Sequence, residues 1–486
     1  MTELDKDLLS IQEARDCAVN ANKAAQEWLH ASQAEVDRVC EAMANAAFTA
    51  SERLGTMAHE ETGYGVAEHK RLKNEFGSKA VWESIADVPT VGVVKQDFEN
   101  RLTYIAWPMG NVAALTPSTN PTSTVFAKVL TSVKARDSIV IAPHPSAAKS
   151  SMEAAKVMAL AAENAGAPEG LVQCLSNISL PGTQELMRHK YISLILATGG
   201  TPMVKAAHSV GKPALGVGPG NVPVYVDRSA DLEKAARYIV ASKSFDYSTI
   251  CATEQAVIAD RPIANKLMQL MQDQGAYFVN AEQAKKLSEA LFYPNGGINP
   301  LSVGKSPHYL AAMAGISIPE SARILVAPLN KVGADEPLSR EKLTTVLGWF
   351  TVDGWEAGCD RSIEMIKFGG RGHTQIIHAT NEDVILAFGL EKPVFRILVN
   401  TMGTLGAVGL TTGVMPSMTL GAGGFGGSIT GDNITVYHMF NLKRLAYELK
   451  EPPAQALRPG AKPAGPTPQD LEKAVEEVVY DLLLKK

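Results

Sequence analysis

Cys251 is the residue whose type and surroundings best suit covalent chemistry. It follows a loop sequence at 245–250 and precedes a β-branched run at 256–258, so it lies between a predicted helix and a predicted strand. Proteins often place a positioned nucleophile in such a loop, and a cysteine thiolate attacks carbonyl carbons. The alternative is a small buried side chain, which is the common fate of a free cysteine and our interpretation of the other four.

Asn120 is a candidate partner for such a nucleophile. It lies in the segment 116–122, which leaves a predicted strand and enters a helix. An amide at this point could donate to a developing oxyanion, whereas an asparagine that only starts a turn is the alternative. Glycine clusters at 199–200 and 216–220 also follow strands and could admit a phosphate, but neither matches G-x-G-x-x-G in its usual setting.

His373 is the histidine that glycines flank, and it could either face a ligand or be an ordinary loop residue. The histidines and cysteines show no zinc-type spacing, so we expect no metal site. The chain also lacks G-x-S-x-G and a phosphate-binding P-loop, which argues against a serine hydrolase and a nucleoside triphosphatase.

The elements that must position these residues alternate between strand and helix. Short β-branched runs at 138–142 and 192–196 are each followed by a helical pattern, at 146–165 and 201–209. This alternation predicts an α/β fold with a parallel, doubly wound sheet that is covered on both faces. The pattern restarts at 222–226 and continues to about residue 399, which predicts a second α/β domain of similar size.

The composition limits the possible partners. The chain has 486 residues, a net charge of -5 and 20% charged residues, which fits two or three globular domains and favours neither nucleic acid nor an anionic membrane. Five scattered cysteines do not suit a disulfide framework, and no apolar run is long enough to span a bilayer. The acidic start does not resemble a signal peptide, so we expect a cytoplasmic protein.

The C-terminal segment differs from the rest of the chain. Residues 452–468 contain six prolines and two glycines, which predicts an extended linker. Residues 469–486 then predict a helix, with Thr467 as N-cap and Lys485 and Lys486 at its end. The apolar residues of this helix recur at helical spacing and are Leu471, Ala474, Val475, Val478, Val479, Leu482 and Leu483. The segment therefore predicts an amphipathic helix on a tether.

Seven segments also occur in the order typical of one family. They are Thr116 to Thr122, Ala142 to Pro145, Leu196 to Thr201, Gly218 to Asn221, Thr249 to Gln255, Glu341 to Leu343 and Gly372 to Thr374. Through them, residues 5–450 resemble the coenzyme-A-acylating branch of the aldehyde dehydrogenase superfamily. The resemblance is strongest to the acetaldehyde dehydrogenase half of bifunctional alcohol/aldehyde dehydrogenases and to acylating enzymes of bacterial microcompartments.

The resemblance implies an aldehyde dehydrogenase-like fold. A Rossmann-type NAD-binding domain would span 1–226 with a returning segment at 427–451, and an α/β catalytic domain would span 227–426. An antiparallel hairpin near 96–105 would join subunits into a homodimer or homotetramer.

The resemblance also implies a reaction, in which a short aldehyde, acetaldehyde or propionaldehyde, reacts with coenzyme A and NAD to give acyl-CoA and NADH. Cys251 would attack the aldehyde and become acylated, while Asn120 and the Cys251 backbone N–H hold the oxyanion. Nine residues match segments with which the family binds its nicotinamide cofactor, and they are Thr116, Pro117, His144, Thr198, Gly199, Gly200, Thr201, Gly218 and Glu341.

Two departures from hydrolytic relatives are informative. Those relatives carry, at the position aligned with Val217, the glutamate that activates water for deacylation. Without that base an external thiol is favoured, so we expect acyl-CoA rather than free acid. They also carry a lysine where this chain has Ala142, and His144 is the candidate replacement, which leaves the choice between NAD and NADP open.

The aldehyde itself stays open. His373 and Arg371 are candidate substrate-binding residues, and Arg371 could hold an anionic aldehyde such as sulfoacetaldehyde or succinic semialdehyde, although an ordinary surface ion pair is the alternative. A hydrolytic aldehyde dehydrogenase, an acyl-phosphate reductase and a non-catalytic shell-associated scaffold are competing interpretations. By likeness to microcompartment enzymes, 469–486 is a candidate encapsulation peptide for a shell protein, which would place the enzyme inside a bacterial microcompartment.

Overall fold

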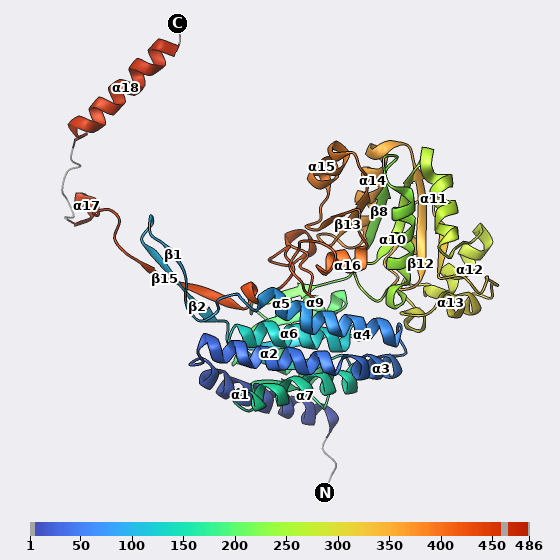
Figure 1. Cartoon of the computed structure of the whole chain (residues 1–486), viewed down its shortest axis with the longest axis horizontal. Helices are drawn as coiled ribbons and strands as arrows, with labels where there is room; N and C mark the ends of the chain where they lie inside the picture. The colour runs from blue at the N-terminus through green and yellow to red at the C-terminus, as the bar shows by residue number, and fades with distance from the viewer. Residues whose placement is uncertain (1–4, 458–464, 485–486) are drawn as a thin grey trace. The chain divides into compact units, whose positions relative to one another are not determined.

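The computed structural model describes residues 5–457 and 465–484 (Figure 1). The chain divides into two compact units, one made of Met1–Val91 and Ala106–Asn441 and the other of Gly92–Ile105 and Leu442–Lys486. Residues 458–464 of the predicted linker and the two terminal lysines, Lys485 and Lys486, lie outside the described residues.

A five-stranded parallel sheet forms the first half of the larger unit. Its order is β5-β4-β3-β6-β7, and the strands are β3 (Asn111–Thr116), β4 (Ser138–Pro143), β5 (Val172–Cys174), β6 (Ile192–Thr198) and β7 (Ala214–Val217). The chain moves outward from β3 to β5 and then returns to β6 on the other side of β3. The strand order therefore reverses between β3 and β6, and such a switch point leaves a crevice at the carboxyl ends of the strands.

Both faces of this sheet are covered by helices. Alternate strand residues such as Val112 and Ala114 pack with helices α2 (Gln33–Thr49), α6 (Pro121–Lys134) and α7 (Ala148–Asn164). Their neighbours Ala113 and Leu115 pack with α1 (Lys6–Trp28), α8 (Leu180–Arg188) and α9 (Thr201–His208). The prediction of a parallel sheet that is buried on both faces is confirmed.

Helix α6 shows how the sequence builds the edge of the crevice. Pro121 occupies its first turn, where a missing N–H costs nothing, so the helix begins directly after Asn120. The helix is buried along its whole length, and the ammonium of Lys128 donates to the carbonyls of Leu115 at 2.7 Å and Leu196 at 2.9 Å. Lys128 thus ties together the ends of β3 and β6 at the switch point.

A seven-stranded parallel sheet forms the second half of the larger unit. Its order is β10-β11-β12-β9-β8-β13-β14, and the strands are β8 (Val222–Val226), β9 (Glu254–Asp260), β10 (Ala276–Phe278), β11 (Ile324–Pro328), β12 (Val346–Val352), β13 (Gln375–His378) and β14 (Ile397–Val399). Helices α10 (Leu232–Ser244) and α11 (Arg261–Asp273) cover one face. The other face carries α12 (Ala281–Leu291), α13 (Pro307–Met313), α14 (Gly354–Phe368) and α15 (Glu382–Glu391).

The sheet boundary differs from the domain boundary expected after residue 226. Strand β8 pairs with β9 and β13, so residues 222–226 belong to the seven-stranded sheet, and the chain crosses between the sheets at 218–221. The returning segment expected at 427–451 also divides. Met439 accepts a hydrogen bond from the Met109 N–H at 3.2 Å beside the first sheet, whereas β15 (Phe440–Ala446) enters a separate small sheet.

The smaller unit contains that three-stranded sheet, in the order β1-β2-β15. Strands β1 (Gly92–Asp97) and β2 (Leu102–Pro108) lie in the region of the predicted hairpin, with β15 as a third strand. Helix α18 (Pro468–Leu484) follows the linker. The Asp470 N–H donates to the Thr467 hydroxyl at 3.2 Å, and the Thr467 N–H donates to the Asp470 carboxylate at 2.9 Å, so the two residues cap the helix reciprocally. None of the described helices is both apolar enough and long enough for a membrane span.

Candidate active site

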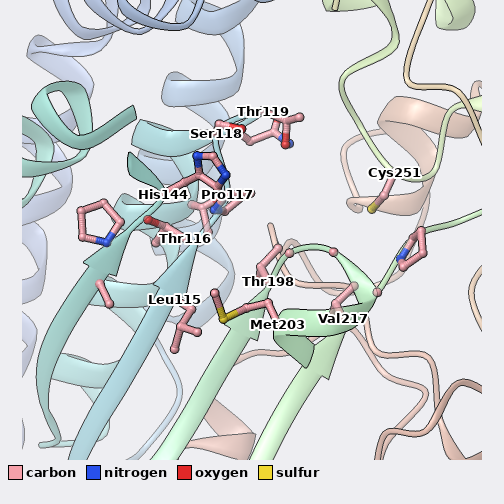
Figure 2. A pocket seen from close by; sticks show the side chains of 18 of the residues that line it. Leu115, Thr116, Pro117, Ser118, Thr119, His144, Thr198, Met203, Val217 and Cys251 are labelled. Carbon is pink, nitrogen blue, oxygen red and sulfur yellow. The ribbon is translucent and has the colours of Figure 1, made fainter. Parts of the chain in front are cut away.

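A cavity that many of the predicted residues line lies at the switch point of the five-stranded sheet. It has a volume of about 690 Å³ and is lined by the ends of β3, β6 and β7 and by the loop that carries Cys251. Figure 2 shows Thr116, Thr198 and Val217 at the ends of their strands, with Cys251 on a loop beyond them. Ten of the predicted residues line this cavity, and they are Thr116, Pro117, Asn120, His144, Thr198, Gly199, Gly200, Gly218, Cys251 and Glu341.

His373 lies behind the cavity wall and contacts the predicted nucleophile directly. Its Nε2 is 3.2 Å from the Cys251 Sγ, and its Nδ1 is 2.9 Å from the Thr374 hydroxyl. If Nδ1 carries the proton and donates it to Thr374, Nε2 is free to accept the thiol proton. The guanidinium of Arg396 holds this segment by donating to the His373 carbonyl at 3.1 Å.

The electrostatics of this pair favour a neutral resting state. Burial, with help from the nearby Arg396 charge, lowers the pKa of His373 to about 3. Burial, together with the Glu341 carboxylate, raises the pKa of Cys251 to about 12. The resting site therefore holds a thiol beside a neutral imidazole, and it is the contact between Nε2 and Sγ, rather than these pKa values, that suits His373 to accept the thiol proton when the sulfur attacks.

The Asn120 amide is held from both ends. Its Oδ1 accepts a hydrogen bond from the Lys73 ammonium at 2.5 Å, and its Nδ2 donates to the Thr249 carbonyl at 3.0 Å and to the Thr119 hydroxyl at 3.2 Å. Asn120 does not cap α6 with its side chain. Its backbone starts the helix, while its side chain is held by these other contacts, and Asn120 lines the same cavity as Cys251.

Glu341 reaches the segment that connects the two sheets. Its Oε1 accepts a hydrogen bond from the Gly220 N–H at 2.8 Å, and burial raises its pKa to about 7. Gly220 also lies directly against the reacting pair. A Cβ atom at Gly220 would stand 2.4 Å from the Cys251 carbonyl oxygen and 3.0 Å from His373 Nδ1, so only glycine fits this position without a shift.

Two hydroxyl groups at the switch point lack partners within the described part of the chain. The Oγ1 atoms of Thr116 and Thr198 are buried at the ends of neighbouring strands, and neither has a hydrogen-bond partner among the described residues. Both residues line the cavity, close to the Gly199-Gly200 turn at which α9 begins. A buried polar atom normally has a partner, so these hydroxyls fit a polar ligand such as a dinucleotide in this crevice.

Three predicted residues are exposed, either at the edge of the cavity or outside its described lining. Thr201 is exposed in the first turn of α9, and Arg371 is exposed on the loop before His373; neither is among the described residues that line the cavity. His144 is exposed at the cavity edge, where its Nδ1 lies 2.8 Å from the Ser146 hydroxyl. Among the described residues, no group of three His, Cys, Asp or Glu side chains could hold a metal ion.

A second cavity of about 340 Å³ shares Ile250, Val408 and Met418 with the first. Its other apolar lining residues are Phe48, Leu72, Phe76, Ala80, Phe245, Leu405 and Leu410. Its charged lining residues are paired. Lys73 binds Asp246, Glu75 binds Arg71, and Lys79 lies 3.9 Å from Glu83, the fourth charged residue of the lining.

The sequence prediction did not include Lys73, Asp246, Gly220 or Arg396. Lys73 stands in α4 (Ala67–Glu75), a segment so rich in charge that it predicts an exposed helix, yet the Lys73 side chain is buried. The one available signal was the glycine cluster at 216–220, for which we predicted contact with a phosphate and not with Cys251 and His373.

Residues 8–284 match the Aldehyde dehydrogenase family, which is more than half of the chain. The fold and the arrangement of Cys251 at the switch point agree with that match, and the chain belongs to the aldehyde dehydrogenase family. The expectation of this family from the order of seven segments is confirmed.

Individual relatives add detail. A crystal structure of an acetylating aldehyde dehydrogenase from Geobacillus thermoglucosidasius has a TM-score of 0.92 and 49% identity, and the match covers 93% of this chain and 100% of that one. The aldehyde-alcohol dehydrogenase 2 of Entamoeba histolytica is 40% identical over 88% of this chain, but over only 50% of its own length. The succinate-semialdehyde dehydrogenase (acetylating) of Clostridium kluyveri is 35% identical over 88% of this chain and 94% of its own. The chain thus spans about half the length of the aldehyde-alcohol dehydrogenases it matches.

Proposed function

We propose that the protein is a coenzyme-A-acylating aldehyde dehydrogenase. It oxidises a short aldehyde and transfers the acyl group to coenzyme A through a thioester on Cys251. The observation that carries the proposal is the contact of 3.2 Å between Cys251 Sγ and His373 Nε2, beside a ligand-sized cavity at the switch point. Relatives named as acetylating enzymes support the acyl-transfer half of the reaction.

The chain's own residues account for formation of the thioester. Neutral His373 accepts the thiol proton at Nε2 as the Cys251 sulfur attacks the aldehyde carbon. The Asn120 Nδ2 group and the Cys251 backbone N–H donate to the oxyanion of the thiohemiacetal. Collapse of that oxyanion expels a hydride and leaves the acyl group on sulfur as a thioester.

The crevice at the switch point fits a nicotinamide dinucleotide, which supplies the hydride acceptor when it is bound. Thr116 and Thr198 would bind it with their unpartnered hydroxyls, and the Gly199-Gly200 turn before α9 would approach its phosphates. Pro117, Gly218 and Glu341 would form the remaining walls. His144, at the edge, is the candidate contact for the adenosine ribose, and the choice between NAD and NADP would depend on it.

The carboxylates that line the cavity indicate whether water or coenzyme A accepts the acyl group. Val217 is buried in the cavity wall at the position where hydrolytic relatives carry their water-activating glutamate. Glu341 is the one carboxylate among the described residues of this lining, and it binds the Gly220 N–H. Water therefore lacks a free carboxylate base beside the thioester, and the thiol of coenzyme A, a stronger nucleophile than water, is the better acceptor. His373 first releases the Cys251 proton to solvent and then takes the proton of the coenzyme A thiol as Cys251 leaves.

We place the aldehyde chain in the second cavity, because this cavity shares Ile250, the residue before Cys251, with the first. The lining of the second cavity favours a neutral aliphatic aldehyde over an anionic one. Its walls are mostly apolar, and each of its lysines already contacts a carboxylate. The Lys73 ammonium is fully used, because its three donors face Asn120, Asp246 and Thr249. The exposed Arg371 is not among the described residues of either lining. We therefore favour acetaldehyde or propionaldehyde, with succinic semialdehyde and sulfoacetaldehyde as the alternatives.

Two measurements test this function. Formation of NADH from each of the four aldehydes should require coenzyme A, give acyl-CoA, and show a higher kcat/KM for the neutral aldehydes. The Cys251→Ala variant should lose activity in both directions and still bind the nicotinamide cofactor. Rapid production of free acid without coenzyme A would contradict acyl transfer, and a higher kcat/KM for an anionic aldehyde would contradict the substrate class.

Assembly into a homodimer or homotetramer through the three-stranded sheet belongs to the same proposal. Apolar side chains stay exposed on this unit, including Val93, Phe98 and Leu445, of which Phe98 is 83% exposed. A sheet that leaves such residues uncovered suits an interface with a second copy of the chain. Light scattering of the purified protein measures the state, and a monomer at micromolar concentration would contradict this part.

The terminal helix suits docking on a shell protein of a bacterial microcompartment in the cytoplasm. Leu471, Val475, Val478 and Val479 recur at helical spacing and are 48–60% exposed. An isolated helix of this length is marginal in water, so it needs a groove to cover its apolar stripe. Residues 452–486 fused to a fluorescent protein should collect in shells, and the truncated enzyme should lose localisation but keep its activity. A diffuse fusion, or a truncated enzyme that fails to assemble, would show that the helix is structural.

A further inference from the structure

A buried polar cluster joins helix α4 to the loop that carries the nucleophile. The Lys73 ammonium, in α4, donates to Asn120 Oδ1 at 2.5 Å, to the Thr249 hydroxyl at 3.1 Å and to the Asp246 carboxylate. Lys73 is 4% exposed, Asp246 0% and Thr249 1%. A buried lysine whose three donors are all used is fixed in place, because any rotation breaks a hydrogen bond that no water can replace.

This cluster decides which way the Asn120 amide faces. An asparagine side chain has an acceptor at one end and two donors at the other, and a rotation of half a turn exchanges them. An ammonium offers donors only, so Lys73 can bind the Oδ1 end and not the Nδ2 end. The Thr249 carbonyl, 3.0 Å from Nδ2, selects the same orientation from the other side. The second Nδ2 hydrogen donates to the Thr119 hydroxyl at 3.2 Å, and the developing oxyanion would replace that hydroxyl as its acceptor. A reversed amide would present its oxygen there and would repel the oxyanion.

The charge of Lys73 also makes the amide a better donor. A hydrogen bond from a cation to an amide oxygen withdraws electron density from the amide nitrogen and strengthens the bonds that its N–H groups donate. The effect is largest in a buried site, where few waters screen the charge. A neutral residue at position 73 would lose this polarisation even if it kept the orientation.

Asp246 holds Lys73 in position and offsets part of the burial that lowers the pKa of Lys73 to about 8, so Lys73 carries its charge at neutral pH. Its carboxylate also accepts hydrogen bonds from the Val66 N–H at 2.7 Å and the Thr249 hydroxyl at 2.5 Å, and Lys70 lies 3.2 Å away. Burial alone would raise the pKa of Asp246, but Lys73, Lys70 and the Thr249 hydroxyl outweigh it and lower the pKa to about 2. Asp246 is therefore a carboxylate throughout the working pH range.

The backbone around Asp246 depends on the same contacts. Asp246, Tyr247 and Ser248 have φ values of 45°, 49° and 70°, in the left-handed region that residues other than glycine seldom adopt. Gly65 lets the carboxylate approach, since a Cβ there would stand 1.9 Å from Asp246 Oδ1. This strained stretch leads within three residues to Cys251, so the cluster joins the oxyanion donor to the nucleophile loop.

We propose that Lys73 is a positioning residue for the reaction, which orients and polarises the Asn120 amide toward the oxyanion while Asp246 holds the ammonium in place. The inference rests on the proposed function, because it concerns the oxyanion of that reaction. Because Lys73 acts through Asn120, its removal cannot lower kcat through the amide by more than the removal of Asn120 would. That upper limit is a reduction in kcat of about 10² to 10³.

A double-mutant cycle tests the proposal. The Lys73→Met variant should lose about 10-fold to 10² in kcat, as part of the loss of one oxyanion donor, with kcat/KM falling in parallel. In the Asn120→Ala background the same substitution should cost less than about 3-fold, because the amide through which it acts is gone. An equal loss in both backgrounds would overturn the proposal and assign Lys73 a structural role only.

The Lys70→Met variant is the matched control. Lys70 is a buried lysine of the same helix and contacts the same Asp246 carboxylate, but its other bond goes to the Thr119 carbonyl and not to the Asn120 side chain. Its substitution should cost the same small factor in both backgrounds. If Lys73→Met does not fold, Lys73→Gln combined with Asp246→Asn keeps a neutral, similarly shaped pair and must show the same dependence on Asn120.

The wild-type enzyme separates the two ways of failing. If it forms no NADH with aldehyde and coenzyme A, the proposed function is wrong. If it does, and Lys73→Met retains the wild-type kcat, the positioning role is wrong and the function stands. Unfolding curves and cofactor binding, measured on every variant, show that the compared proteins are folded.

Discussion

Gly220→Ala perturbs the site at the point where the two sheets meet. Gly220 does not have a positive φ, so an alanine can adopt its backbone conformation, and steric contact is the main change. The new Cβ would stand 2.4 Å from the Cys251 carbonyl oxygen, whereas ordinary contact begins at 3.4 Å. It would also stand 3.0 Å from His373 Nδ1 and 3.1 Å from its Cγ. One methyl group thus presses on both Cys251 and His373.

The size of the effect follows from these distances. The Cys251 backbone must retreat by about 1 Å, and a misplacement of that size at a reacting centre costs roughly 10² in rate. Overpacking of this kind costs about 1–3 kcal/mol in stability, which a domain of this size tolerates. We therefore expect a folded Gly220→Ala enzyme with about a hundredth of the wild-type kcat.

Steady-state formation of NADH in the presence of coenzyme A measures kcat, and alkylation of Cys251 by iodoacetamide reports on the thiol separately. Gly389→Ala is the control, because Gly389 lies exposed in α15 with no atom within 4 Å of its added Cβ. That control should keep its activity and gain a little stability. A Gly220→Ala enzyme with a kcat within about threefold of wild type would refute the reasoning, since 10² is expected for such a shift.

Two further predictions concern other residues of the site, and a third concerns the buried carboxylate of Glu254, which accepts a hydrogen bond from the Gly403 N–H at 2.8 Å. His373→Ala should lower kcat by about 10² to 10⁴, the usual contribution of a general base, and leave cofactor binding intact; stopped-flow acylation of Cys251 measures it. Val217→Glu should produce free acid in the absence of coenzyme A, and product analysis detects it. A variant that forms acyl-CoA normally when coenzyme A is present, but forms no acid when it is absent, would show that the new carboxylate does not reach the thioester. Burial raises the pKa of Glu254 from 4.5 to about 7, so this group's contribution to stability is present below pH 4.5 and is lost as the pH rises through 7. The free energy of unfolding of Glu254→Gln should therefore improve relative to wild type by about 2–3 kcal/mol between pH 5 and pH 8, and a constant difference would refute the assignment.

The sheets could be predicted from the sequence for a simple physical reason. Strands such as 138–142 and 192–196 are continuous apolar runs, and burial on both faces requires that pattern. Cys251 and Asn120 stand in ordered segments that identify the family, so their roles were inferred from that order. The structure adds that both residues line the first cavity.

The polar cluster could not be predicted in the same way. Lys70 and Lys73 belong to a helix whose composition suggests full exposure, and their partner Asp246 lies more than 170 residues away. Hydrophobic periodicity reports which face of a helix is apolar, but not which charged residues meet a distant counter-ion. The domain boundary expected after residue 226 differs from the sheet boundary for a related reason. Residues 222–226 have the pattern of any buried strand, and only their pairing with β9 assigns them to the seven-stranded sheet.

The left-handed stretch at 246–248 has a consequence for engineering this protein. A left-handed conformation costs a residue other than glycine about 1–2 kcal/mol, so three in succession oppose folding by roughly 3–6 kcal/mol. Glycine at Tyr247 would relieve part of that cost and stabilise the fold, but the same freedom would loosen the approach to Cys251. Selection for heat resistance would therefore favour glycine in this loop, whereas selection for turnover would disfavour it. Thermostable variants that keep their rate should gain their stability elsewhere in the chain.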